Sequence, residues 1–476
     1  MLAITKNLSL NRVGGVQRPE KVEQRSRFGT CSQSLRWSRF AGIIGSIAVL
    51  TIGWISPAPA ASPLVNVNEA ARHGLQRVWF AQIDVDQARN RVAHWTLHKD
   101  YLFALTTAGT IHALDAETGA TRWVARVGSP ERLTVGPAAN DVYLAVLNGS
   151  RLHVLDLRDG HLIWSRTVGS APAAAPVLSG RYVYVALLNG RIEGHRLDNP
   201  ATPVWFYQSE GRIFQAPTVA DQLLSWTTDR GNLYAAHAET PGMIFRMETN
   251  EEFVASVAEF DTYLYAASLS GYLYCVEGLS GNERWRYATG FPIASTPAIV
   301  GEKAFVVSEA PALHAVDTKT GHSLWTTPDA SQFVAQGPKQ VYGMDRFGSL
   351  LILDRKTGRI VGRLTTGEDI GAIVNDQTDR IYLVNDRGLV QCLRELDAAE
   401  PILYRKPLGK KKASDKKAKK GGKEKKASAK DSAGAEKKPS NASPAPATTG
   451  QDNNSPESNE APSAADPFSD ANPFGE

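Results

Sequence analysis

Cysteine is scarce in this chain of 476 residues, which contains only Cys31, Cys275 and Cys392. No two of them are close enough in sequence to form a Cys-x-x-Cys metal pair. A glycine-rich phosphate loop and a nucleophile elbow with Ser-His-Asp partners are also missing. The sequence therefore carries none of the common signals of a metal centre, a nucleotide site or a hydrolase.

Long apolar runs are missing as well. The longest, residues 40–55, has 16 residues, whereas a membrane-spanning helix needs about 20. It follows a basic leader and precedes the small residues Ser56 to Ala61, a pattern typical of an exported chain. We expect residues 1–61 to be a signal peptide cleaved near Ala60 or Ala61, or an uncleaved signal anchor, and we expect a periplasmic or envelope location. Cys31 precedes the apolar run, so a lipidation motif is absent.

Large apolar residues almost disappear after residue 404. Residues 405–438 hold fifteen Lys or Arg and four acidic residues, and residues 439–476 hold six acidic residues and no base. Such a composition cannot bury enough apolar surface to become ordered, so we predict a disordered tail over 405–476. Two interpretations stay open for the tail. It is a solvated spacer, or it attaches electrostatically to anionic lipid or a cell-wall polymer, and no nucleic acid is expected.

The region between these two ends repeats one pattern eight times. A turn glycine recurs at steps of 37 to 41 residues, with Pro311 in the sixth place, at Gly109, Gly149, Gly190, Gly231, Gly271, Gly348 and Gly388. An aromatic residue stands six positions before it in seven repeats, and an acidic residue follows it in six. Aromatic and β-branched segments bounded by such turns indicate four short strands in each period, which is typical of a propeller blade.

We therefore predict an all-β fold, an eight-bladed β-propeller of four-stranded blades over residues 75–404, with residues 62–74 as a linker. The segment 75–85 places Trp79 forty-four residues before Trp123 and resembles the last strand of a blade. We expect this segment to pair into the eighth blade and close the ring.

A second turn glycine and a large apolar residue form another column. The glycines are Gly119, Gly160, Gly281 and Gly321, and the apolar residues are Trp123, Trp164, Trp205, Trp285 and Trp325, with Phe245 and Val361 in two further blades. We predict that these rings pack between neighbouring blades and that the glycine leaves room for a close approach. The acidic residue before this turn can accept hydrogen bonds from the turn backbone, so its expected role is structural.

Two of these segments support a family resemblance. Residues 113–123 and 315–325 both read A-x-D-x-x-T-G-x-x-x-W. This resembles the tryptophan-docking motif of pyrroloquinoline-quinone (PQQ) type propeller repeats, and the chain looks most similar to the BamB-like outer-membrane assembly propellers. The resemblance implies a scaffold that is not an enzyme and holds no cofactor. A quinoprotein dehydrogenase would, by the same resemblance, bring a calcium site and usually a vicinal cysteine pair, but no cysteines are adjacent here.

Four histidines stand three residues before the acidic column, at His112, His153, His195 and His314. One histidine per blade places the rings on different sheets, about 10 Å apart, whereas zinc needs its nitrogens within about 2.1 Å. We therefore expect no metal. Cys275 and Cys392 fall three blades apart, so we expect no disulfide between them.

The turns supply the candidate partner surface, because mid-blade turns and blade-to-blade connectors share one face of a propeller. The candidate residues are Asp229, Arg230, Asp345, Arg346, Asp386 and Arg387, with Glu248, Glu251 and Glu252 of an acidic connector. We expect an envelope protein to bind there and the chain to be a monomer. Two alternatives remain open: a small PQQ-dependent quinoprotein dehydrogenase, and a membrane-anchored ligand-sensing propeller.

Overall fold

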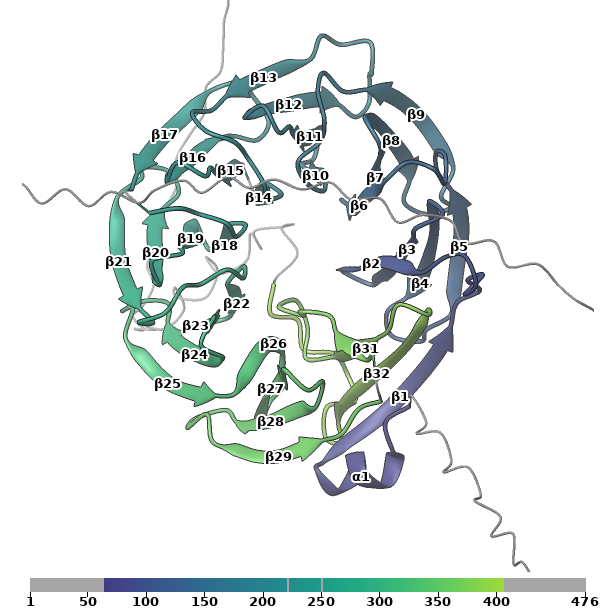
Figure 1. The fold of residues 1–476 in the computed structure, drawn as a ribbon, viewed down its shortest axis with the longest axis vertical. Helices are drawn as coiled ribbons and strands as arrows, with labels where there is room; N and C mark the ends of the chain where they lie inside the picture. Colours follow the sequence, from purple (N-terminus) through teal and green to yellow (C-terminus); the bar gives the residue numbers. More distant parts are fainter. Residues whose placement is uncertain (1–63, 221, 250, 368, 406–476) are drawn as a thin grey trace, which may run out of the picture. The chain divides into compact units, whose positions relative to one another are not determined.

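Eight antiparallel four-stranded sheets are arranged around a central axis in the computed structural model (Figure 1). It describes residues 64–220, 222–249, 251–367 and 369–405. The predicted eight-bladed propeller is thereby confirmed. The predicted leader (1–61) and the tail beyond Arg405 lie outside the described residues. Within the described ranges, no helix has both the length and the apolar character to cross a bilayer.

The blades are numbered here in chain order, each from its innermost to its outermost strand. Blade 1 contains β2 (Val92–His98), β3 (Tyr101–Thr106), β4 (Thr110–Asp115) and β5 (Thr121–Arg126), and blade 2 contains β6 (Thr134–Ala139), β7 (Tyr143–Asn148), β8 (Arg151–Asp156) and β9 (Leu162–Thr167). Blade 3 contains β10 (Val177–Leu178), β11 (Tyr182–Ala186), β12 (Arg191–Arg196) and β13 (Trp205–Gln208), and blade 4 contains β14 (Thr218–Ala220), β15 (Leu223–Thr227), β16 (Asn232–His237) and β17 (Met243–Glu248).

The second half of the ring follows the same plan. Blade 5 contains β18 (Ala258–Phe260), β19 (Tyr263–Ala267), β20 (Tyr272–Glu277) and β21 (Glu283–Ala288), and blade 6 contains β22 (Ala298–Val300), β23 (Lys303–Ser308), β24 (Ala312–Asp317) and β25 (Ser323–Pro328). Blade 7 contains β26 (Ala330–Gln336), β27 (Gln340–Asp345), β28 (Leu350–Asp354) and β29 (Ile360–Leu364), and blade 8 contains β30 (Gly371–Ala372), β31 (Ile381–Val384), β32 (Leu389–Glu395) and β1 (Leu75–Gln82).

Burial follows the position of a strand within its blade. The two middle strands are buried almost throughout, as in β3 and β4, because both faces of the sheet pack against neighbouring blades. The outermost strand β5 alternates instead, with Trp123 buried and Val124 exposed. The middle strands therefore read as continuous apolar runs, and the core consists of one apolar layer between each pair of blades.

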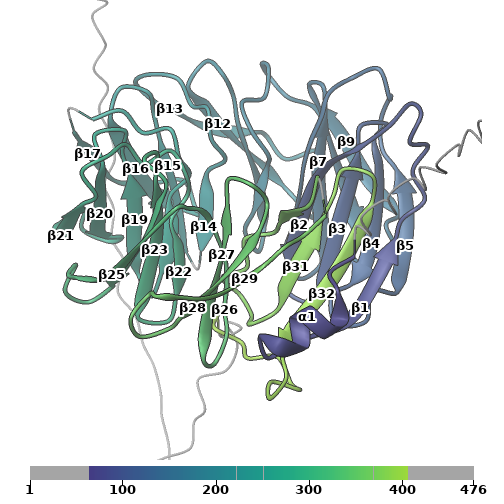
Figure 2. The ribbon, with the colours of Figure 1, turned by 60° about the horizontal axis from the view of Figure 1, so that its bottom comes forward.

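The ring closes through β1, as the sequence predicts. β1 pairs antiparallel with β32 over seven residue pairs, from Leu75 opposite Glu395 to Gln82 opposite Leu389. Figures 1 and 2 both show β1 alongside β32, at the outer edge of blade 8. Blade 8 is thus built from the first and last strands of the folded chain.

The residues before β1 are packed rather than extended. The predicted linker contains α1 (Val67–Arg72), which begins at Asn66, whose side chain accepts hydrogen bonds from the backbone N–H groups of Asn68 and Glu69. Val65 and Ala70 are buried in the apolar layer between blades 7 and 8. We refer to residues 64–74 as the N-terminal strap.

Candidate functional site

The predicted docking rings lie between blades, and each ring meets the glycine of the next blade rather than its own. A Cβ on Gly160 of blade 2 would lie 2.5 Å from Cε3 of Trp123 in blade 1. The Trp123 indole Nε1 also donates to the carbonyl of Leu157, at 2.9 Å. The same contact joins Trp79 to Gly119, Phe245 to Gly281, Trp285 to Gly321 and Trp325 to Gly358. A contact between blades thus accounts for the recurrence of both residues.

Two rings depart from this arrangement. Blade 3 lacks the second turn glycine that Trp164 would meet, and Gly242 of blade 4 lies against His237 rather than Trp205. Trp164 keeps the hydrogen bond, from Nε1 to the carbonyl of Leu197 at 2.8 Å. Trp205 packs instead over Gly194 of its own blade and edge-on against Tyr184, with ring centroids 5.6 Å apart. Trp205 also packs on Tyr207, which stacks on Trp226 of blade 4 with ring centroids 5.5 Å apart, so aromatic rings join blades 3 and 4.

Blade 7 has no ring of its own at this position. The prediction for Val361 is wrong, because Gly362 lies opposite Ile352, where Trp325 in blade 6 lies opposite Ala315. A Cβ on Gly362 would lie 2.5 Å from Nδ1 of His73. The imidazole from the N-terminal strap thus occupies the place that an indole takes in other blades.

Replacing Gly160 by Ala is expected to destabilise the propeller beyond the backbone effect. Both Gly160 and Gly290 have a positive φ, +73° and +82°, but a Cβ on Gly290 would meet nothing within 4 Å. The left-handed backbone costs alanine about 1–2 kcal/mol at either place. Displacing the Trp123 ring adds about 1–3 kcal/mol for Gly160→Ala alone. Chemical unfolding of both variants measures the difference, and equal losses would contradict the docking contact.

The acidic column stabilises the turns, as predicted. Asp115 Oδ1 accepts hydrogen bonds from the backbone N–H of Thr118 at 2.8 Å and from its hydroxyl at 2.9 Å. Asp317 and Asp354 make the equivalent bonds. Burial opposes the ionisation of Asp115, but hydrogen bonds from Arg122 and Thr118 outweigh it and hold its pKa below the ordinary value. Hydrogen bonds donated by Thr357 likewise lower the pKa of Asp354.

These lowered pKa values predict that the propeller loses stability in acid. A carboxylate whose folded-state pKa lies below its unfolded value stabilises the fold above about pH 4, and the contribution disappears as pH falls through the lowered value. We expect Tm to be steady from pH 7 to 5 and to fall below about pH 4. Replacing both Asp317 and Asp354 by Asn should weaken this dependence, whereas Asp261→Asn, at an exposed position outside these turns, should not. A Tm unchanged at pH 3 would contradict it.

Mid-blade turns and blade connectors meet on one face, which we call the connector face. Backbone hydrogen bonds join the two kinds of loop in blades 1, 4 and 5, from Val127 N to Gly109 O, Thr249 N to Gly231 O and Thr289 N to Gly271 O. The face therefore carries loops from every part of the ring. This arrangement is the one that the sequence predicts for the candidate partner surface.

The structure separates the predicted partner residues into two groups. Asp345 has a side chain only 2% exposed, and it accepts hydrogen bonds from Phe347 N and Ser349 N and pairs with Arg363. Asp229 is 16% exposed and holds Arg212. Asp345 shapes its own turn and Asp229 joins its turn to the connector between β13 and β14, so both carboxylates are already engaged within the fold. The exposed members are Arg230, Glu248, Glu252, Arg346, Asp386 and Arg387, with Glu251 half-buried.

Large apolar side chains on the same face were missed by the sequence analysis. Leu133 is 78% exposed, Phe347 is 77% exposed and Phe291 is 54% exposed, with Phe214 and Leu188 also exposed. Arg212 lies 5.1 Å from the Phe214 ring and Arg346 lies 5.2 Å from the Phe347 ring. The usable signal was a phenylalanine directly beside a turn glycine, as in Gly290-Phe291 and Phe347-Gly348. A phenylalanine in such a loop lies outside the apolar layers between blades.

The histidines and cysteines singled out in the sequence lie apart from one another in the described ranges. No group of three or more His, Cys, Asp or Glu there could hold a metal ion. The four histidines lie on β4, β8, β12 and β24 in separate blades. Cys275 and Cys392 are buried and free, on β20 and β32.

Comparison with known proteins identifies the family. The sequence profile of the family described as "Outer membrane protein assembly factor BamB" matches residues 84–245 and 230–380. No curated protein matches the chain. BamB from Moraxella catarrhalis shares 20% identity and a TM-score of 0.55, covering 67% of this chain and 97% of its own.

Two further solved structures share the fold. The computationally designed Ika8 protein has 14% identity and a TM-score of 0.51, covering 66% of this chain and 99% of its own. The C-terminal WD40 domain of Sif2 has 12% identity and a TM-score of 0.52, covering 67% and 98%. The profile matches together span more than half of the sequence, so the chain belongs to the outer membrane protein assembly factor BamB family.

Proposed function

We propose that this protein is an exported, non-enzymatic scaffold of the cell envelope that binds a protein partner through its connector face. The observation that carries the proposal is the set of exposed apolar side chains on that face, led by Leu133 and Phe347. Exposed aromatic rings flanked by arginines are the groups that most often anchor protein interfaces. The BamB family match supports binding in general, and the basic leader with its apolar run supports export.

The proposal assigns distinct roles to the parts of the face. Phe214, Phe291 and Phe347 act as anchors that are desolvated on binding. The exposed charges, such as Arg230, Asp386 and Arg387, lie around them and set orientation and association rate more than affinity. The lysine-rich tail adds electrostatic contact with an anionic envelope surface, which weakens with salt.

Capture of partners from an envelope extract tests the role of this face. We expect the full chain to retain at least one envelope protein, and the triple variant Phe214→Ser, Phe291→Ser, Phe347→Ser to lose it. Leu279, which is 62% exposed in a turn between β20 and β21, provides a control away from the connector face as Leu279→Ser. Equal capture by the triple variant and the wild type would overturn the assignment.

Two further measurements test the other parts of the proposal. Mixing the protein with PQQ and Ca²⁺ should produce neither quinone absorbance on the protein nor dye reduction. Quinone absorbance alone would show a cofactor site, and dye reduction would make the chain an enzyme. N-terminal sequencing of the protein from its native cell should find a start near residue 61. An intact leader would instead favour the signal anchor.

A further inference from the structure

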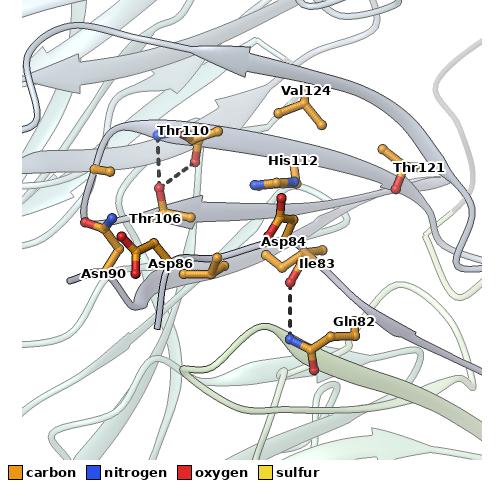
Figure 3. Close-up of a pocket in the computed structure, with 12 residues that line it drawn as sticks. Gln82, Ile83, Asp84, Asp86, Asn90, Thr106, Thr110, His112, Thr121 and Val124 are labelled. Atoms are coloured by element: carbon orange, nitrogen blue, oxygen red, sulfur yellow. Dashed lines mark hydrogen bonds between the residues drawn. The ribbon is translucent and has the colours of Figure 1, made fainter. Parts of the chain in front are cut away.

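A cavity of about 490 Å³ lies at the junction of blades 8 and 1, a volume in the range of small-ligand sites. It forms where the connector between β1 and β2 passes the turn between β3 and β4. Figure 3 shows Asp84, Asp86 and Asn90 of the connector on one side and Thr106, Thr110 and His112 of blade 1 on the other. Val124 and Thr121 of β5 complete the wall.

His112 lines this cavity without a hydrogen-bond partner among the described residues. His112 is 6% exposed, yet its imidazole makes no hydrogen bond with any residue that the structure describes. In blade 6 the equivalent His314 contacts the hydroxyls of Ser308 and Tyr287. Burial lowers the pKa of His112, with an opposing effect from Asp84, so the ring is neutral and offers one nitrogen as an acceptor. His112 lines the cavity, so a ligand there can reach its ring.

The charge at the cavity is negative. The exposed Asp84 forms no hydrogen bond or ion pair within the described ranges, and its carboxylate lies beside His112 in Figure 3. Arg91 pairs with Asp386 at 3.5 Å and Arg89 pairs with Asp86 at 3.9 Å, which leaves Asp84 as the cavity carboxylate without a cation. Ile83, Val85 and Val124 supply the larger apolar side chains of the wall.

We propose that this cavity binds a cationic side chain, lysine or arginine, presented by an extended segment of a protein partner. Asp84 neutralises the cation, His112 accepts one of its hydrogen bonds, and the apolar side chains of the wall contact the aliphatic stem. β5 is the last strand of its sheet, so its outer edge offers backbone groups to an added strand beside the cavity. The identity of the carrier rests on the proposed function, whereas the cavity chemistry does not.

Methyl NMR of the full chain, labelled at isoleucine and valine, tests the cavity directly. N-acetyl-lysine methylamide should shift the methyl signals of Ile83, Val85 and Val124 in a saturable way. N-acetyl-norleucine methylamide, which lacks the ammonium group, should bind at least tenfold more weakly, and the arginine analogue shows which cation fits better. Equal responses to lysine and norleucine would overturn the inference.

Two substitutions sharpen this test. Asp84→Asn should weaken lysine binding about tenfold, and Asp261→Asn, at an exposed aspartate away from the cavity, should leave it unchanged. Unchanged binding in Asp84→Asn overturns the inference. If Asp84→Asn captures the envelope partner as well as wild type while the triple phenylalanine variant does not, the cavity has no part in binding and the proposed function stands. Loss of capture in every form, wild type included, overturns the proposed function alone.

Discussion

Removal of β1 is expected to open the ring and to lower Tm by more than 10 °C. β1 contributes seven residue pairs to blade 8, and Trp79 packs over Gly119 of blade 1. Truncating a buried tryptophan alone costs about 3–5 kcal/mol. Without β1, β32 becomes an exposed edge and the apolar layer between blades 8 and 1 meets solvent.

Three N-terminal truncations separate β1 from its neighbours. A chain that begins at Leu64 keeps the strap and β1 and should melt like the full chain. One that begins at Leu75 loses only the strap, including His73 over Gly362, and should show a smaller loss. One that begins at Asp84 loses β1 and should show the large one. Equal Tm values for the chains that begin at Leu75 and Asp84 would show that β1 does not close the ring.

Arg380→Met is expected to cost about 3–5 kcal/mol of unfolding free energy. The Arg380 side chain is 1% exposed, and the residue directly precedes β31. Its Nε donates to Glu117 of blade 1 at 3.1 Å, its Nη1 to Asp379 at 3.2 Å and its Nη2 to the carbonyl of Ala399 at 2.9 Å. One side chain thus joins blade 8, blade 1 and the segment after β32. Removing it leaves the buried Asp379 without its cation, which is the costly way to break a buried ion pair.

The pH dependence of the stability loss in Arg380→Met distinguishes the effect of an unpaired, buried Asp379 carboxylate from the effect of lost packing contacts. Burial already raises the pKa of Asp379, against hydrogen bonds from Ile402 N and the charge of Arg380. An acid whose folded-state pKa lies above its unfolded value favours folding at low pH and loses that contribution as pH rises through the folded value. The deficit of Arg380→Met should therefore be larger at pH 7 than at pH 5.

Control variants complete the Arg380 experiment. Adding Asp379→Asn to Arg380→Met should recover part of the loss at pH 7, because no unpaired charge is then buried. Arg126→Met, at an exposed position on β5, should change stability by less than about 0.5 kcal/mol. A loss in Arg380→Met no larger than that in Arg126→Met would contradict the role of this side chain.

The sequence was sufficient for the blade count and for ring closure, because both follow from a period. The forty-residue spacing of turn glycines and aromatic residues marks each blade once, which gives the blade count. Trp79 lies about one period before Trp123, which indicates the strand that closes the ring. The docking direction was not readable, since Gly119 and Trp123 lie four residues apart in sequence while each meets a residue of a different blade. Adjacent positions in a repeat do not reveal which copy they contact.

The candidate site was less predictable, because its residues are defined by departures from the repeat. Asp345 and Arg346 are neighbours in sequence, yet one side chain is buried in the turn and the other is exposed. His73 replaces an indole from outside the repeat altogether. The cavity beside His112 depends on the path of one connector. Such features depend on the path of individual loops, and the repeat period carries no information about those paths.

The pairing of Leu75 with Glu395 sets how the ring responds to force. Leu75 is the first residue of β1 and Glu395 the last residue of β32, so the chain enters β1 and leaves β32 at the same end of the pair. A force that pulls these two points apart therefore breaks the antiparallel hydrogen bonds one residue pair at a time. Peeling of this kind meets far less resistance than sliding two strands past each other. The N-terminal strap and Arg380 lie at that end of blade 8, so their contacts must break before the first residue pair of β1 and β32 separates.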